Sequence, residues 1–236
     1  IYLQQTNYFG DLEDAKAIGE IVQAAGAKFV MGVNPIACAI LPTPREEGAD
    51  IAVGDGQPLG VDTAFGGPYL GFMATTSAMT RKLPGRIVGQ TTDVDGKTGY
   101  VLTLSAREQH IRREKASSNI CSNQALCAFA AGVYMAAMGE GGMKQCARLC
   151  TSKAHYFASE LERTGCTLKY KNEFFHEFVT EVSCPDCRKK ILDALAENGI
   201  LGGAEVAGGI LWCVTELVSK AQLARAAEIV KEVCAK

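Results

Sequence analysis

Short apolar runs and one longer amphipathic run alternate along the first part of the chain. Residues 1–5 (IYLQQ), 28–33 (KFVMGV) and 49–54 (ADIAVG) have the length and apolar content of buried strands. Residues 11–27 instead carry apolar side chains at helical spacing, with acidic side chains at the start. A strand, a helix and a strand in this order predict the βαβ unit of a parallel sheet. Residues 70–76 (LGFMATT) are expected to add a further strand.

The middle of the chain predicts an irregular segment followed by two long helices. Residues 77–104 show no sustained period, but Asp95–Gly96 is typical of a hairpin turn. Apolar helices are expected over about 119–138 and 143–163, because the glycines at positions 139, 141 and 142 separate them.

The end of the chain predicts a compact α+β module. Strand, helix, strand and helix are expected in turn over residues 175–183, 186–199, 209–216 and 219–235. We therefore predict an α/β protein with two domains. Residues 1–140 form the sheet domain, and residues 141–236 form the linking helix and the smaller module.

Composition narrows the functional classes. Of 236 residues, 47% are hydrophobic and 21% charged, and 24 basic against 26 acidic side chains leave a net charge of −2. This balance offers no basic field for nucleic acid. The apolar runs are shorter than a membrane span and no signal peptide is recognisable, so we expect a cytoplasmic protein. Because the chain opens at Ile1 inside an expected strand, we expect the C-terminal half of a longer protein.

The ten cysteines are scattered through apolar and helical stretches, which is typical of buried reduced thiols. Only Cys184 and Cys187 form a close pair in a C-x-x-C pattern. A zinc site would need a second pair or nearby histidines, and the three histidines are dispersed. We interpret the pair as a strand-to-helix turn and expect no metal site, with a redox or metal role as the alternative.

Two stretches carry candidate chemistry. GDGQPLG (54–60) contains G-x-G, but its third glycine is misplaced and no helix follows, so a nucleotide site is the weaker interpretation. The glycines after it, Gly66 and Gly67, suit either a strand-end corner or a close approach to a ligand. REQHIRREK (107–115) suits a salt-bridged exposed segment, or an anion site ahead of a helix N-terminus near Asn119.

Three stretches together resemble one family. They are IYLQQTNYFGDLED (1–14), GADIAVGDGQPLGVDTAFGGPYLGF (48–72) and the 48 residues from RKLPGRIVGQTT to NQALCA (81–128). They resemble the glycine cleavage system P-protein family, the pyridoxal-phosphate glycine decarboxylases, and within it the alpha chain (subunit 1) of the two-subunit form. The resemblance implies the fold type I, aspartate-aminotransferase-like architecture, of which this chain would contain part of the large domain and the small C-terminal domain.

The resemblance also implies an activity and partners. The enzyme, an oxidoreductase of amino-acid catabolism, decarboxylates glycine and passes the aminomethyl group to the lipoyl arm of the H-protein. Such an enzyme needs a lysine that binds the cofactor covalently and an acid that pairs with its pyridine nitrogen. In the fold the acid follows the strand corresponding to residues 28–33, and the lysine follows the one corresponding to 49–54. Asn34 and Gln57 follow instead, and no lysine occurs between Lys28 and Lys82.

We therefore expect a catalytically silent subunit, inactive alone, whose beta-chain partner supplies the lysine for pyridoxal phosphate. Residues expected to contribute to the partner's site are Arg107, His110, Arg113, Asn119, Gly66 and Gly67, with Pro68 shaping the interface. The alternative is a structural or interaction module that stabilises the beta chain or docks the H-protein without contributing to the active site.

Overall fold

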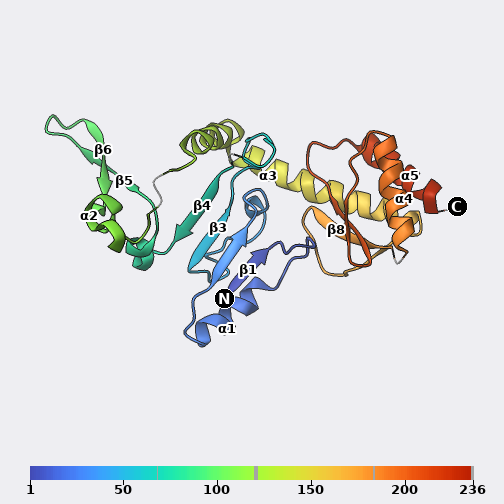
Figure 1. The fold of residues 1–236 in the computed structure, drawn as a ribbon, viewed down its shortest axis with the longest axis horizontal. Helices are drawn as coiled ribbons and strands as arrows, with labels where there is room; N and C mark the ends of the chain where they lie inside the picture. The colour runs from blue at the N-terminus through green and yellow to red at the C-terminus, as the bar shows by residue number, and fades with distance from the viewer. Residues whose placement is uncertain (68, 120–121, 183, 235–236) are drawn as a thin grey trace.

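The computed structural model describes residues 1–67, 69–119, 122–182 and 184–234. Figure 1 shows an elongated molecule with three parts in a row. A sheet with the N-terminus lies in the middle, a hairpin arm extends to one side, and an α+β module with the C-terminus lies on the other side. The long helix α3 (Ala125–Arg163) runs from the sheet to the module.

The central sheet has the strand order β1-β2-β3-β4. β1 (Tyr2–Gln5), β2 (Val30–Val33) and β3 (Ile51–Asp55) run parallel, and β4 (Gly71–Thr75) is antiparallel to β3. The first crossover contains α1 (Ala15–Ala24). The βαβ unit and the fourth strand that the sequence predicts are thus confirmed.

The helix predicted over residues 11–27 is confirmed as α1, but it begins at Ala15 and ends at Ala24. Asp14 is the N-cap, and its Oδ1 accepts from the amide of Ala17 at 3.0 Å. Gly26, with φ of +67°, follows the last turn. Val22 on α1 packs with the fully buried Phe29 and Met31, and burial of each such side chain contributes roughly 1.5–3 kcal/mol.

The arm is a two-stranded antiparallel hairpin, a regular element where the sequence predicted an irregular segment. β5 (Ile87–Thr92) pairs with β6 (Thr98–Thr103). The turn between them contains Gly96 at φ +76°, and the amide of Asp93 donates to the carbonyl of Lys97 at 2.8 Å. The hairpin turn predicted at Asp95–Gly96 is therefore confirmed.

Short helical turns flank the hairpin. These are the 3₁₀ turns η2 (Ser77–Lys82), η3 (Ser105–Arg107) and η4 (Arg113–Lys115), and the four-residue helix α2 (Gln109–Arg112). A single 3₁₀ turn, η1 (Ala37–Ala39), also follows β2.

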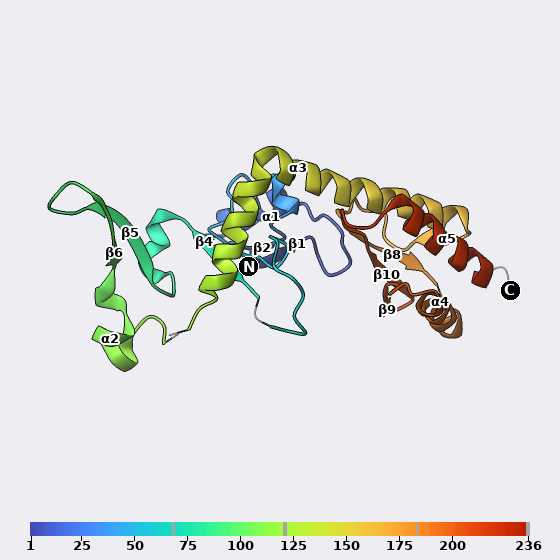
Figure 2. The same cartoon turned by 90° about the horizontal axis from the view of Figure 1, so that it is seen from above.

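Helix α3 joins the two long helices expected from the sequence. It starts at Ala125 rather than near residue 119, and Gly139 has non-helical angles (φ 60°, ψ −179°), which is the predicted break. Figure 2 shows the two parts of α3 meeting at an angle. In the described part of the chain, α3 is the one helix long and apolar enough to cross a membrane, with an 18-residue window of mean hydropathy 1.2. Core helices of soluble proteins meet the same criterion but are mostly buried, whereas 6% of this stretch is buried, so the expectation of no membrane span stays a prediction.

The C-terminal module is a second four-stranded sheet, in the order β7-β8-β10-β9, with helices beside it. Trp212 on β10 donates from Nε1 to Thr180 Oγ1 on β8 at 2.8 Å inside the core. The predicted strand–helix–strand–helix pattern is confirmed, and two short strands are added. The elements are β7 (Thr167–Leu168), β8 (Glu177–Glu181), α4 (Pro185–Glu197), β9 (Ala204–Val206), β10 (Gly209–Cys213) and α5 (Lys220–Cys234).

A shared core joins the sheet part to the module. Ile36 and Leu59 from the sheet part pack in one cluster with Cys150 of α3 and Phe175, which precedes β8. Asp11 also forms an isolated antiparallel bridge with Phe174. Because α3 contributes to the cores on both sides, the boundary predicted at residue 140 falls inside this helix and stays an interpretation.

Candidate functional site

A cleft opens at the carboxyl end of the parallel strands. In open α/β sheets this edge is where ligands bind, because the strands end there beside one another. The cavity measures about 390 Å³. Its lining residues are Tyr2 and Gln4 of β1, then Gly32 to Pro35, then Val53 to Asp55, and finally Gln57 and Pro58.

Turns that bond to their own side chains shape the cleft. Asn34 follows β2, and its Oδ1 accepts from the amide of Ile36 at 2.9 Å, which starts the 3₁₀ turn η1. Asp55 ends β3, and its Oδ1 accepts from the amide of Gln57 at 2.9 Å. Such Asx turns hold the chain in a tight bend at each strand end.

The chemistry of the lining set is neutral and acidic. None of the described residues that line the cleft carries an amine, a guanidinium or an imidazole. Gln57 lies after β3, and its Nε2 donates to the carbonyl of Val61 at 2.6 Å. The side chains of this cleft therefore do not fit a cofactor that needs a lysine for a covalent bond or a basic side chain for its phosphate.

Tyr2 and Gln4 line the cleft although the sequence analysis did not select them. They alternate on β1 with Leu3, which packs toward α1, and the Tyr2 hydroxyl donates to Gln4 Oε1. A Cβ at Gly32 would overlap the ends of both side chains, which would have to move aside. Strand alternation in IYLQQ was the available signal.

The loop between β3 and β4 carries Gly66 and Gly67. Gly66 has φ of +96°, and no heavy atom lies within 4 Å of a Cβ added at either glycine. The neighbouring Phe65 is fully exposed, with φ of +50°. The loop thus presents backbone and one aromatic ring to its surroundings, while Pro68 lies outside the described residues.

Arg107 lies on the arm, where it organises a turn. Its guanidinium donates to the carbonyls of Leu83 and Gly85, the latter at 2.8 Å, and its Nη2 lies 3.6 Å from a Glu108 oxygen. Its side chain is 11% exposed. Arg107 therefore positions the segment between β4 and β5 against the segment after β6.

His110, Arg113 and Asn119 are exposed. His110 and Arg86 line a small cleft of about 350 Å³ with Glu108 and Ser105. Arg113 adopts φ of +53°, a conformation that favours glycine. Figure 1 shows the arm, with α2 on it, projecting away from the central sheet. The structure thus places these residues on a different segment from Gly66 and Gly67, and their role stays a prediction.

The Cys184 and Cys187 pair forms the predicted strand-to-helix turn. Cys184 is the N-cap of α4, and its Sγ accepts from the amide of Cys187 at 3.2 Å. Pro185 occupies the first turn, as is usual at helix starts.

Comparisons with known proteins agree on one family. The family model described as glycine cleavage system P-protein matches residues 1–230. A protein of Desulfitobacterium hafniense named probable glycine dehydrogenase (decarboxylating) subunit 1 is 49% identical over 235 residues, which is 95% of this chain and 52% of that protein. The chain spans about half the length of the curated relatives it matches.

Solved structures show the fold. A crystal structure of glycine decarboxylase (P-protein) of the glycine cleavage system, in inhibitor-bound form, has a TM-score of 0.91 at 40% identity. It covers 98% of this chain and 54% of that chain. An alanine–glyoxylate aminotransferase from Nostoc sp. has a TM-score of 0.66 at 16% identity and covers 99% and 61%. The predicted architecture of fold type I pyridoxal-phosphate enzymes is therefore confirmed.

Proposed function

Because the chain belongs to the glycine cleavage system P-protein family, we propose that it is part of the subunit of glycine decarboxylase that lacks the cofactor lysine. The assembled enzyme decarboxylates glycine and transfers the aminomethyl group to the lipoyl arm of the H-protein. Pyridoxal phosphate, when bound to the assembled enzyme, supplies an electron sink for the decarboxylation. The lysine that binds it belongs to the second subunit.

The cleft at the carboxyl end of β1, β2 and β3 carries this proposal. It lies where a fold type I enzyme has its site, yet its described lining residues include no amine. Asp55 and Gln57 occupy the end of β3, and Gln57 is tied to the loop backbone. The cleft is thus a formed part of the fold without the group that the chemistry requires.

We propose further that the exposed cations of the arm face the second subunit. Arg113 and His110 are exposed, and His110 lines a small cleft together with Arg86 and Glu108, so the arm presents basic side chains to its surroundings. A phosphate or a carboxylate would suit such a cleft. Arg107 supports this arrangement indirectly, since it fixes the turn that precedes α2.

A cofactor titration tests the silent-subunit proposal. The protein in its natural length, without the second subunit, is mixed with pyridoxal phosphate and treated with borohydride, and mass spectrometry locates any reduced adduct. We expect no stoichiometric adduct, whereas the second subunit should give one on a single lysine. A stoichiometric adduct on one lysine of this chain would contradict the proposal.

The second candidate function is a module that only stabilises its partner. The bonding of Arg107 to backbone carbonyls favours it, because that contact serves the fold of the arm itself. Arg113→Ala in the reconstituted enzyme separates the two functions. If Arg113 contributes to the active site of the second subunit, the variant should show a raised KM for glycine or weaker cofactor binding while assembly stays intact. If the role is purely structural, both values should stay unchanged.

A further inference from the structure

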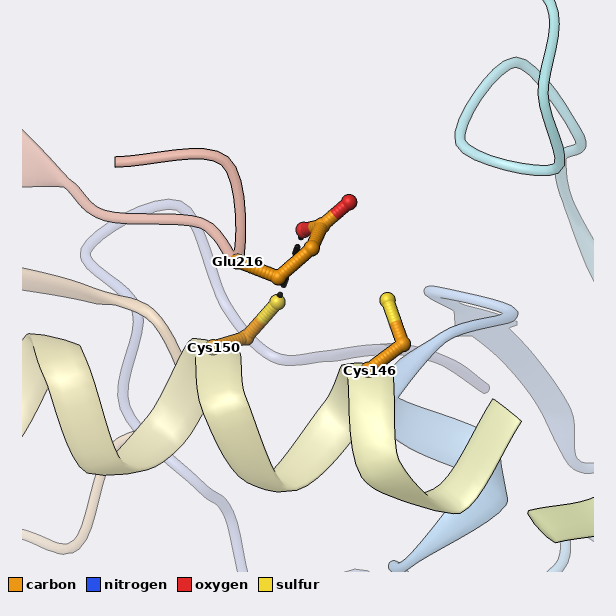
Figure 3. Close-up of side chains that lie close together, drawn as sticks. All are labelled: Cys146, Cys150 and Glu216. Atoms are coloured by element: carbon orange, nitrogen blue, oxygen red, sulfur yellow. Dashed lines mark hydrogen bonds between the residues drawn. The ribbon is translucent and has the colours of Figure 1, made fainter. Parts of the chain in front are cut away.

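Two cysteines of α3 and one glutamate lie together away from the cleft. The ligand atoms of Cys146, Cys150 and Glu216 are all within 4.8 Å of one another. Cys146 and Cys150 are buried, at 4% and 3% exposure, and Glu216 is half-buried. Figure 3 shows both thiols projecting from successive turns on one side of α3, with the carboxylate of Glu216 above them.

The fold holds this cluster from two directions. Cys146 and Cys150 are four residues apart on a helix, so their side chains lie on the same face. Glu216 lies in the segment after β10, and this segment packs against α3. Cys150 Sγ lies 3.2 Å from Glu216 Oε2, and the Lys153 ammonium donates to the backbone carbonyl of Glu216. The segment is thus bonded to α3 through both the carboxylate and the backbone carbonyl of Glu216.

We propose that Cys146, Cys150 and Glu216 form a binding site for a borderline-soft divalent cation such as Zn²⁺. Two thiolates and one carboxylate are ligands that zinc accepts, and a water molecule would complete a tetrahedron. At Zn–S distances of about 2.3 Å, two sulfurs of a tetrahedral site are about 3.8 Å apart. Small rotations of the side chains therefore suffice to bring the three groups onto an ion.

Charge and protons balance at this site. Binding of M²⁺ forms two metal–sulfur bonds and one metal–oxygen bond, and the two thiol protons pass to the solvent. Three anionic ligands against one dication leave one excess negative charge, and the Lys153 ammonium lies beside Glu216. Burial raises the pKa of both thiols, so without an ion Cys150 is a neutral donor to the Glu216 carboxylate.

The competing explanation is a thiol–carboxylate contact that only satisfies Glu216. Rival ligands among the described residues are His176 with Glu177 and Cys213, and the Cys184–Cys187 pair. A decisive experiment must therefore detect an ion, count its thiolates and locate them.

Cobalt(II) provides the probe, since tetrahedral thiolate–cobalt sites absorb strongly and report sulfur ligation. The protein in its natural length, reduced and free of affinity tags, is titrated with Co²⁺ and then with Zn²⁺. We expect one Co²⁺ per chain, a thiolate charge-transfer band, displacement by Zn²⁺ and release of two protons per ion. No band, or no proton release, would overturn the proposal.

Variants locate the site. Cys150→Ser should remove at least half of the band and weaken Co²⁺ binding by more than about tenfold, the lower range for loss of even an outer-shell partner. Cys213→Ser and the double variant Cys184→Ser/Cys187→Ser are matched controls that should bind as the wild type does. A band that survives Cys150→Ser, or that disappears with either control, would place the ion elsewhere and overturn the assignment.

Glu216→Gln keeps the test decisive if Cys150→Ser fails to fold. Glu216 is half-buried and the amide has the same shape, so the fold should persist while Co²⁺ affinity falls by about ten- to a hundredfold. The charge-transfer band at saturation should remain, because both thiolates remain. An unchanged affinity would remove Glu216 from the site and contradict the three-ligand proposal.

Discussion

At the scale of single residues, Arg107 shows how one nearly buried cation can hold a loop. Its guanidinium bonds to two carbonyls, and its Nε is buried without a partner among the described residues. Lysine cannot reproduce the paired contact, because it lacks the planar fork of donors. The residue type is therefore specific to this turn.

Arg107→Lys should loosen the arm by about 1.5 kcal/mol, the lower range for a hydrogen bond to a charged group. That cost corresponds to roughly tenfold faster hydrogen exchange of the β5–β6 amides. Arg112→Lys is the control, since Arg112 is exposed and donates, among the described residues, to the single carbonyl of Ala106 at 3.1 Å. Equal exchange in the two variants would contradict this role.

His176 predicts a pH dependence of stability. Burial lowers its pKa from 6.5 to about 4, partly opposed by the charge of Glu216, and its Nδ1 has no partner among the described residues. The folded state favours the neutral ring, so the unfolded chain takes up the proton first as the pH falls. His176 therefore makes its full contribution to the free energy of unfolding above about pH 6.5. As the pH falls toward 4 the protein loses that contribution, which is at most about 3 kcal/mol.

Urea unfolding at pH 7.5, 5.5 and 4.5 measures this effect. The wild type should lose more stability over that range than His176→Gln, whose side chain does not titrate. The difference between the two proteins removes the contribution of neighbouring titrating groups, including Glu177 and Cys213, which lie beside His176. Parallel loss in both proteins would show that His176 is not the responsible group.

At the scale of elements, the kink in α3 depends on Gly139. Its angles suit glycine alone, and Gly139→Ala should cost about 1–3 kcal/mol of unfolding free energy. Gly141 lies two residues on in regular helix with open space around it, so Gly141→Ala should stabilise by about 0.5–1 kcal/mol. Opposite signs in thermal unfolding confirm the kink, and equal stabilisation would mean a straight helix.

The local pattern of apolar and polar residues predicted most of the helices and strands, because an element that buries one face repeats its apolar residues at a regular spacing. The strand in IYLQQ, the capped helix at Asp14 and the break at Gly139 are each encoded within a few residues. The hairpin of the arm was missed apart from its turn, since its strands are largely exposed and show no apolar alternation. The start of α3 was placed about six residues too early.

At the scale of the whole molecule, the sequence predicted that the lysine is absent after β3. It did not predict which side chains from distant segments lie together. The lack of basic side chains among the described lining residues of the cleft follows from the residues after β2 and β3, once their strand ends are known to meet. Cys146 and Cys150 show helical spacing in the sequence, but only the packing of the segment after β10 adds Glu216. Long-range proximity of this kind leaves no local signal.

The first half of α3 exposes an apolar face to solvent. The large exposed side chains on this face are Leu126, Phe129 and Val133, at helical spacing. Apolar patches of this kind are typical of surfaces that contact another chain. We therefore expect the protein to self-associate when its partner subunit is absent.

Sedimentation velocity over a range of concentrations checks this expectation. Phe129→Lys should reduce self-association at least several-fold without loss of helicity, because it places a charge in the patch. Leu217→Lys is the matched control, since Leu217 is 84% exposed but lies after β10 in the C-terminal module. A monomeric wild type, or an equal effect of both changes, would refute a specific contact through α3.

The core shared by the sheet part and the module also sets an order in time. Ile36 and Leu59 leave the ribosome long before Cys150 and Phe175, with which they pack. The C-terminal module, by contrast, is built from one contiguous stretch of chain. During synthesis the Ile36 and Leu59 side chains must wait for partners that are made 91 to 139 residues later. Chaperones that shield nascent chains would act on this waiting interval.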